Sequence, residues 1–234
     1  MGKRIIQQAR GHGSMTYQVR KYAYRFKVGY PNLQGKGKVI SLVDSPAHYA
    51  PLAKVLVNGQ IFYNLAVAGL TEGQEINLGK LEKDGDIGMI KDIPTGTKIF
   101  NVEISPGDGG KLVRTSGGYA LILTKDKEVE IALPSGKVIK LDGRCRATLG
   151  IISGAGRKEK PFVKAGNKFY LMKSKNKFWP RTSAVKMNVV DHPFGSGRGK
   201  NLAHGRKGKI AKRNAPAGAR VGLLRPSRTG RKKR

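Results

Sequence analysis

The sequence predicts a mostly-β protein built from small barrels, and three observations lead to this expectation. Glycine accounts for 32 of the 234 residues, about twice its ordinary share, and glycine-rich chains favour turns and short strands over long helices. Short runs of β-branched and aromatic residues recur between Gly and Pro signals, at the spacing typical of small barrels. Neither a helical repeat nor an internal sequence repeat is evident.

The first half of the chain contains three predicted strands, Val39–Val43, Lys54–Val57 and Ile61–Ala66. Asn58-Gly59 separates the second of these strands from the third. This dipeptide is the preferred type I′ hairpin turn, because both central residues of that turn adopt a positive φ. We therefore expect a tight antiparallel hairpin here.

The second half of the chain contains four more predicted strands, Thr97–Ile104, Tyr119–Thr124, Glu128–Leu133 and Lys137–Leu141. Leu133-Pro134-Ser135-Gly136 separates the last two, and its proline fixes φ at a turn position. The segment Lys80–Pro94, which precedes these strands, is instead polar and acidic and contains Asp84-Gly85. We expect the junction between two domains in this segment.

Positive charge is concentrated at the two ends of the chain. The net charge is +31, from 46 Lys and Arg against 15 Asp and Glu. Residues 1–30 hold seven cations and no acid, residues 31–143 hold 13 of each, and residues 144–234 hold 26 cations and two acids. Such an excess repels itself unless a polyanion neutralises it, and nucleic acid is the usual polyanionic partner.

The segment from Gly195 to the C-terminus is the most basic part, with 14 Lys and Arg and no acid. Its ten apolar residues cannot offset the cost of ordering the backbone, about 1–2 kcal/mol per residue. We expect this tail to become ordered only against RNA; a solubilising tail and a nuclear localisation signal are the alternatives. The cations expected to bind phosphates in it are Arg198, Lys200, Arg206, Lys207, Lys209, Lys212, Arg213, Arg220, Arg225 and Arg228.

The N-terminal segment 20–30 interleaves cations with aromatic rings, among them Arg20, Lys21, Tyr22 and Arg25. This pattern fits neutralisation of phosphates together with stacking of the rings on unpaired bases. It fits equally well an amphipathic strand whose rings pack on the first barrel. The sequence leaves both interpretations open.

Several classes of protein and site are excluded by the sequence. No stretch of 18 apolar residues could span a membrane, and the N-terminal residues lack the apolar core of a signal peptide, so we expect an intracellular protein. The single cysteine, Cys145, excludes a disulfide framework and a cysteine-rich zinc site. We expect Cys145 to be a buried apolar residue rather than a reactive thiol. The glycine-rich segments 150–157 and 195–200 match neither a dinucleotide-binding motif nor a P-loop.

Two neighbouring motifs are specific enough to suggest a family: Trp179-Pro180-Arg181, and the run Val185-Lys186-Met187-Asn188-Val189-Val190-Asp191-His192-Pro193-Phe194-Gly195-Ser196-Gly197. Together they resemble the signature loop of the large-subunit ribosomal protein L2 family. The similarity extends over nearly the whole chain, and the tail is similar to the archaeal and eukaryotic branch. Further matching segments are Gly35–Val39, Ala50–Val55, Pro106–Arg114, Leu133–Gly136, Cys145–Gly150, Ala215–Gly218, Val221–Leu223 and Arg228–Arg231.

The signature loop departs from the family pattern at two places. Thr182-Ser183 stands where the family usually has Arg-Gly, so the basic contact of that arginine is not carried over to this chain. His-Pro-Phe-Gly at residues 192–195 replaces the bacterial His-Pro-His-Gly. Any role of a second histidine in the loop is therefore absent.

The resemblance implies an OB-like barrel followed by an SH3-like barrel, with extended basic arms at both ends. The corresponding division is an N-terminal arm at 1–34, the OB-like barrel at 35–84, the SH3-like barrel at 85–178 and a basic tail with the signature loop at 179–234. The implied function is that of a structural constituent of the large ribosomal subunit, bound to ribosomes in the cytoplasm. Its primary partner is the large-subunit ribosomal RNA, and it supports subunit association, tRNA binding and the peptidyl transferase region.

The further expectations concern partners and cofactors. Neighbouring ribosomal proteins and the small subunit, through an intersubunit contact, are expected partners; a membrane and a small-molecule substrate are not. No cofactor is expected, although Mg²⁺ could bridge the chain to RNA. Outside the tail, the residues expected to contact RNA are Arg4, Arg10, Arg20, Lys21, Tyr22, Arg25, Lys111, Arg114, Arg144, Arg146, Arg157, Arg181, Lys186, Asn188, Asp191 and His192.

Asp191 and His192 also raise the question of catalysis, since a carboxylate next to an imidazole could serve as a general base. Adjacent side chains rarely point at each other, however, and no nucleophile motif accompanies the pair. We therefore expect His192 to bind or stack on RNA, and we expect no enzymatic activity. The alternatives are a non-ribosomal RNA- or DNA-binding architectural protein and an RNA-modifying enzyme.

Overall fold

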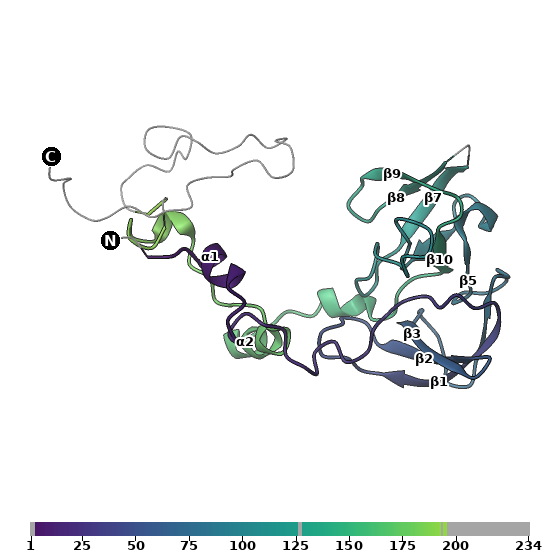
Figure 1. Ribbon diagram of the computed structural model, residues 1–234, viewed down its shortest axis with the longest axis horizontal. Helices are drawn as coiled ribbons and strands as arrows, with labels where there is room; N and C mark the ends of the chain where they lie inside the picture. Colours follow the sequence, from purple (N-terminus) through teal and green to yellow (C-terminus); the bar gives the residue numbers. More distant parts are fainter. Residues whose placement is uncertain (1–2, 126–127, 193, 196–234) are drawn as a thin grey trace, which may run out of the picture. The chain divides into compact units, whose positions relative to one another are not determined.

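The computed structural model describes residues 3–125, 128–192 and 194–195 (Figure 1). The chain divides into two compact units. The strand unit is Arg20–Ala165, and the terminal unit consists of the described parts of Met1–Val19 and Gly166–Arg234. Residues 20–34 of the expected N-terminal arm thus belong to the strand unit, and residues 166–178 of the expected second barrel belong to the terminal unit.

The strand unit confirms the mostly-β fold class. Its described residues form a single ten-stranded sheet in the order β3-β2-β1-β4-β5-β10-β6-β7-β8-β9. All neighbouring strands are antiparallel except β4 and β5, which pair in parallel through Leu78 and Ile87. The strands are β1 (Gly35–Val43), β2 (Leu52–Val57), β3 (Gln60–Leu65), β4 (Glu75–Leu78), β5 (Ile87–Met89), β6 (Lys98–Phe100), β7 (Ala120–Lys125), β8 (Val129–Ala132), β9 (Val138–Leu141) and β10 (Arg146–Leu149).

Three apolar cores lie within the strand unit. The core of the first half includes Val39, Val55 and Ile76, and that of the second half includes Ile99 and Ile131. Residues alternate in burial along the core strands, as expected for strands with one face on a core. A core in each half agrees with the OB-like and SH3-like bodies that the resemblance implies, and the third core draws buried residues from both halves.

The turns expected from sequence are confirmed. Asn58 and Gly59 connect β2 to β3 with φ values of 47° and 80°, so both residues have the positive φ that a type I′ turn needs. The turn from β8 to β9 is closed by Gly136, whose N–H donates to the Leu133 carbonyl at 2.9 Å. Local turn chemistry therefore sets the register of both hairpins.

The segment expected to be a domain junction, Lys80–Pro94, is part of the sheet. It contains β5 and the short 3-10 helix η1 (Ile90–Asp92). One of the acidic residues of this segment, Asp86, is buried, with only 1% of its surface exposed. The Asp86 carboxylate accepts the backbone N–H groups of Asn77, Glu82 and Lys83 at 2.7–2.9 Å. The segment is thus a folded turn that brings β5 beside β4, and the domain junction expected in it stays a prediction.

One predicted strand is shorter than expected. The run Thr97–Ile104 contains only the three residues of β6, because Asn101 adopts a positive φ of 49° and ends the strand. Asn101 is fully buried, and its side-chain Nδ2 donates to Asn64 Oδ1 at 2.9 Å. A buried hydrogen bond therefore stabilises the break in the strand.

The helices were not expected from the sequence. They are α1 (Ile6–Gly11) and α2 (Ala165–Ser174), with 3-10 helices η2 (Ala155–Lys158) and η3 (Ala184–Lys186) in addition to η1. The helix α2 buries none of its residues. It therefore lacks the apolar stripe by which a surface helix is recognised in a sequence.

A buried polar network connects the two halves of the strand unit. The Tyr30 hydroxyl donates to the Asn101 carbonyl at 2.7 Å and lies 2.7 Å from Thr148 Oγ1. Asn64 Nδ2 donates to the same Thr148 oxygen at 3.0 Å. These residues come from the segment before β1, from β3, from the end of β6 and from β10. Each bond satisfies a polar group that would be costly to bury alone.

The network continues into a buried ion pair between Glu103 and Arg146. The Glu103 side chain is fully buried, and its Oε1 accepts Arg146 Nη2 at 2.8 Å. The Glu103 carboxylate also accepts the backbone N–H groups of Gly107 and Gly109. Burial raises the pKa of Glu103, but the bonds from Arg146, Gly109 and Gly107 outweigh it and hold the pKa below its ordinary value.

The single cysteine is buried, as expected. Cys145 is 0% exposed and belongs to the core of the second half. Burial raises the pKa of its thiol to about 11, with Glu103 and Asp142 adding to the effect. At neutral pH Cys145 is therefore a protonated thiol that fills space in the core.

Removing the buried carboxylate tests how much the ion pair contributes. Glu103→Ala leaves the largely buried Arg146 without its counter-charge, so we expect the free energy of unfolding to fall by about 3–5 kcal/mol at pH 7. Because the pKa of Glu103 in the folded chain lies below 4.5, its contribution is present above that pH and is lost as the pH falls through the folded pKa. Urea unfolding of both proteins at pH 7 and pH 3 measures the difference, which should shrink at pH 3.

The matched control for this variant is Glu130→Ala. Glu130 pairs with Lys140 at 3.2 Å on the protein surface, and exposed pairs contribute little to stability. We expect this control to unfold like the wild type. Equal stability of the wild type and Glu103→Ala at pH 7 would contradict the importance of the buried pair.

Candidate nucleic-acid interface

The signature loop of the terminal unit is closed by hydrogen bonds of its own backbone. The N–H of Lys186 donates to the Ser183 carbonyl at 2.9 Å, where η3 begins. The N–H groups of Asp191 and His192 donate to the Asn188 carbonyl at 3.0 and 3.2 Å. The loop residues 183–192 therefore present their side chains from a folded turn rather than from an extended chain.

The N-terminal segment binds this loop. The N–H of Lys3 donates to the Val190 carbonyl at 2.9 Å, and Lys3 Nζ pairs with Asp191 at 3.2 Å. A shallow cavity of about 440 Å³ lies between the two segments. Its lining brings together the sequence-predicted residues Arg4, Lys186, Asn188 and Asp191 and adds Lys3, Ile6, Thr182 and Met187.

Asp191 and His192 do not act on each other. Asp191 is engaged by Lys3, while His192 Nδ1 accepts the N–H of Phe194 at 3.1 Å. The rings of His192 and Phe194 lie 5.0 Å apart. Burial lowers the pKa of His192, so the imidazole is neutral at pH 7. With Nδ1 accepting, its proton lies on Nε2, which is a donor suited to a phosphate or ribose oxygen.

Some aromatic residues of segment 20–30 pack within the strand unit, as one interpretation of the sequence expects, and others are exposed and available for stacking, as the other expects. The ring of Phe26 packs 4.8 Å from that of Tyr63 in β3, and Tyr30 is buried in the polar network. Tyr22 and Tyr24 are instead 75% and 58% exposed. The predicted cations Arg20, Lys21 and Arg25 are also exposed. The exposed part of this segment is thus positively charged and carries two accessible rings.

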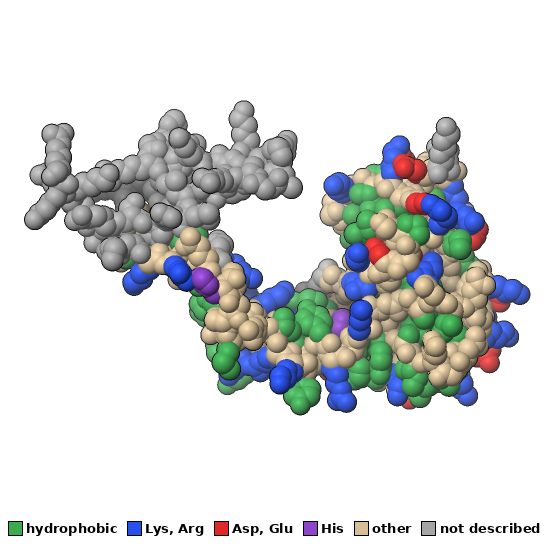
Figure 2. Space-filling model, in the orientation of Figure 1, with side chains coloured by type: hydrophobic (Ala, Val, Ile, Leu, Met, Phe, Trp, Pro, Cys, Tyr) green, Lys and Arg blue, Asp and Glu red, His purple; other side chains and the backbone are tan. Residues whose placement is uncertain are grey.

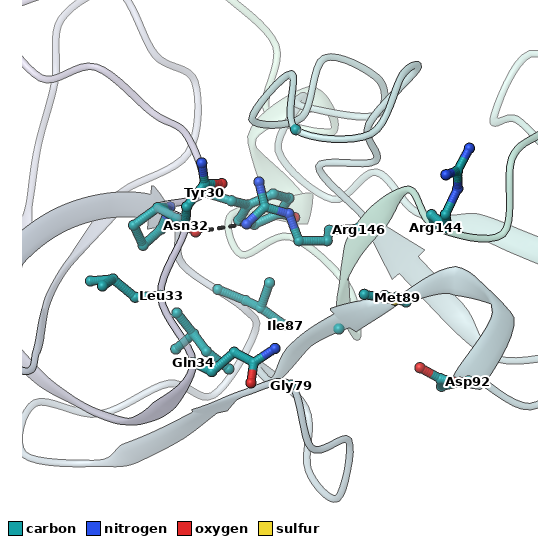
Figure 3. A pocket seen from close by; sticks show the side chains of 14 residues that line it. Tyr30, Asn32, Leu33, Gln34, Gly79, Ile87, Met89, Asp92, Arg144 and Arg146 are labelled. Carbon is teal, nitrogen blue, oxygen red and sulfur yellow. Dashed lines mark hydrogen bonds between the residues drawn. The ribbon is translucent and has the colours of Figure 1, made fainter.

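Two of the predicted arginines in the strand unit are bound within the chain. Arg146 donates to Glu103 and, through Nη1, to the Pro31 carbonyl at 2.6 Å (dashed line in Figure 3). Arg114 Nε donates to Asn101 Oδ1 at 2.7 Å, and its Nη2 donates to the carbonyls of Val28 and Gly109. These contacts account for both guanidinium groups; RNA contact by them stays a prediction.

Other predicted cations of the strand unit are accessible. The exposed Arg144 pairs with Asp142 at 2.7 Å, and the exposed Lys111 pairs with the largely buried Asp108 at 3.4 Å. Arg157 lies over the Tyr49 ring, 3.9 Å from its centroid. Exposed ion pairs are weak, so a phosphate can compete for Arg144 and Lys111.

A second cavity, of about 560 Å³, lies in the strand unit (Figure 3). Its walls come from the segment before β1, from β4 and β5, and from Arg144 and Arg146 at β10. Leu33, Ile87 and Met89 form its apolar part. Arg146 is held there by its internal bonds, so the lining is preformed.

The remaining predicted residues lie in the terminal unit or outside the described residues. Arg10 in α1 and Arg181 before η3 are exposed. The tail cations Arg198, Lys200, Arg206, Lys207, Lys209, Lys212, Arg213, Arg220, Arg225 and Arg228 lie outside the described residues.

Among the described residues, no group of three or more His, Cys, Asp and Glu could hold a metal ion, and none of the helices is long and apolar enough to cross a membrane.

Comparison with known proteins identifies close relatives. Residues 83–215 match the family model described as Ribosomal Proteins L2, C-terminal domain. The chain is 44% identical to the large ribosomal subunit protein uL2 of Hyperthermus butylicus over 241 residues, covering 100% of both chains. It is 45% identical to the protein of that name from Nanoarchaeum equitans and 42% identical to that from Methanocaldococcus jannaschii, again over 100% of both chains.

Substitution of two arginines distinguishes a cation that contacts RNA from one that stabilises the fold. Arg144→Gln removes an exposed cation, so we expect RNA affinity to fall and the salt slope to decrease by about 0.7–0.9, the value of one phosphate contact, with little change in unfolding. Arg146→Gln leaves Glu103 buried without its counter-charge, so we expect a marked loss of stability. RNA titrations at several KCl concentrations, with thermal unfolding of each variant, measure both. A stable Arg146→Gln protein with weakened RNA binding would contradict this assignment.

Proposed function

Because the chain belongs to the ribosomal protein L2 family, we propose that it is a structural constituent of the large ribosomal subunit that binds large-subunit ribosomal RNA. The observation that carries this proposal is the end-to-end similarity to relatives named large ribosomal subunit protein uL2. The distribution of charge supports it, because residues 31–143 are neutral and the excess of 31 positive charges lies in the flanking segments. A chain with this distribution needs a polyanion around its ends.

The proposed mechanism is architectural. The strand unit supplies a rigid body, since its sheet, cores and polar network are internally satisfied. Exposed cations such as Arg20, Lys21, Arg25 and Arg144 neutralise phosphates, and Arg can bind a phosphate through two parallel bonds. Such contacts position the protein on RNA without a chemical step.

The signature loop fits a supporting role near the peptidyl transferase region better than a catalytic one. A general-base histidine needs a partner that orients its ring. Here Asp191 is bound by Lys3, so no carboxylate orients the ring, and the Nδ1 lone pair of His192 is already occupied because it accepts the N–H of Phe194. We therefore propose that His192 donates a hydrogen bond to RNA, and that the chain supports subunit association and tRNA binding without turnover of its own.

The proposal extends to location and neighbours. The chain is ribosome-bound in the cytoplasm, next to other ribosomal proteins, and reaches the small subunit through an intersubunit contact. We further propose that Mg²⁺ bridges carboxylates of the chain to RNA phosphates, because both groups offer the oxygen ligands that Mg²⁺ prefers. A non-ribosomal nucleic-acid-binding protein of similar composition would share the charge but not these neighbours.

Sedimentation of ribosomal particles tests the proposed function. A tagged full-length chain, expressed in the organism that encodes it, should migrate with large subunits after the ribosomes are dissociated at low Mg²⁺. We expect the association to survive a moderate salt wash and to weaken as the salt concentration rises further, because the strength of phosphate contacts falls with salt. Migration as free protein, or with DNA, would reject the ribosomal assignment.

A further inference from the structure

The helix α2 has no apolar core to stabilise it. None of its ten residues is buried, and a helix of this length is marginal in water on its own. Phe169 and Tyr170 are 41% and 69% exposed, and their rings meet edge to face at 5.5 Å. Phe178, just after the helix, is 48% exposed. The terminal unit thus presents several large rings to whatever covers it.

The charge around these rings is almost entirely positive. The described residues of the terminal unit include nine Lys and Arg and a single acid, Asp191, which is already paired with Lys3. Lys168 in α2 holds its ammonium group 5.3 Å from the centre of the Trp179 ring, and Lys173 lies in the last turn of the helix. On the face drawn in Figure 2, blue and green side chains lie together over α2, while red ones lie over the strand unit.

We propose that α2, together with Trp179, is a binding site for unpaired RNA nucleotides, in which Tyr170 stacks on a base and Lys168 and Lys173 bind the adjoining phosphates. This inference rests on the proposed function and adds a site to it. Cations interleaved with exposed rings are the combination that binds single-stranded nucleic acid. The nucleotides must be unpaired, because bases within a duplex have no free face for a ring to stack on.

The order of residues along α2 argues against an apolar partner. Its large apolar residues, Phe169, Tyr170, Leu171 and Met172, are consecutive, so they project around the helix instead of forming one stripe. A groove-binding helix or a membrane-surface helix needs such a stripe. Aromatic rings that project in different directions, each next to a cation, can instead make separate contacts with bases and phosphates.

The chain offers a local probe for this site, because Trp179 is its only tryptophan. Titration of the full-length protein with its cognate large-subunit ribosomal RNA, followed by Trp179 fluorescence, should give a saturable change. We expect Tyr170→Ala to weaken binding about fivefold or more, as loss of one stacked base does. Tyr170→Phe keeps the ring and should bind like the wild type.

Further variants test the contribution of the two lysines, and matched controls on the strand unit show whether any effect is specific to α2. Lys168→Gln combined with Lys173→Gln should lower the salt slope by about 1.4, for two phosphate contacts. Tyr119→Ala removes an exposed ring that lies near a lysine on the strand unit, and Lys98→Gln with Lys137→Gln removes two exposed lysines there; both controls should bind like the wild type. All variants should unfold like the wild type, since none of the substituted residues is buried.

The outcomes separate this inference from the proposed function. If the wild type binds the RNA but the α2 variants bind as tightly as the controls, the α2 site is wrong and the proposed function stands. If the α2 variants lose another ribosomal protein while keeping RNA affinity, the site binds protein and the inference is again overturned. If the wild type itself fails to bind the RNA, the proposed function and this site fall together.

Discussion

The buried contact between Glu103 and Arg146 is the constraint on which much of the strand unit depends. A fully buried carboxylate is tolerated only because Arg146 and three backbone N–H groups surround it. The same contact fixes the loop that contains Gly107 and Gly109, and Arg146 in turn holds the Pro31 carbonyl. One ion pair therefore ties β10, the loop after β6 and the segment before β1 into one body. Together with the Tyr30 network, it sets the shape of the cavity beside it.

This arrangement divides the positive charge of the chain into two kinds. Arg146 and Arg114 are bound to groups of the chain itself, whereas Arg144 stands two residues from Arg146 with its side chain in solvent. The sequence position of an arginine therefore does not indicate whether its guanidinium group is bound within the chain or exposed to solvent. The strand unit can thus keep a rigid fold, with residues 31–143 neutral overall, while exposed cations on its surface and on the described part of the terminal unit are available to RNA. Such a division allows tight electrostatic binding without destabilising the folded body.

The parts of the fold that could be predicted are those set by local chemistry. The Asn58-Gly59 turn is predictable because its residue types determine φ, and the strands around it are marked by runs of β-branched and aromatic residues. The strand β5 was not predicted, because it is three residues long and is defined by pairing with β10, far away in the sequence. The helix α2 was not predicted because its apolar residues form no stripe.

The same reasoning explains the candidate site. The signature motif identified the loop around Asp191 and His192, but its contact with Lys3 depends on chain ends that are nearly 190 residues apart, and no local signal encodes it. The internal role of Arg146 depends likewise on Glu103, 43 residues away in the sequence. Residue type therefore indicates which groups can bind RNA, and tertiary contacts decide which of them are already engaged.

Hydrogen exchange of the full-length chain tests the central claim most directly, namely that a preformed body carries RNA-seeking surfaces. The amides of β1–β10 should be protected in the free protein, because their hydrogen bonds and cores are complete without a partner. The amides of α2 should exchange rapidly in the free protein and gain protection only when the cognate large-subunit ribosomal RNA is added. Strand amides that exchange as fast as those of α2 without RNA would contradict the account.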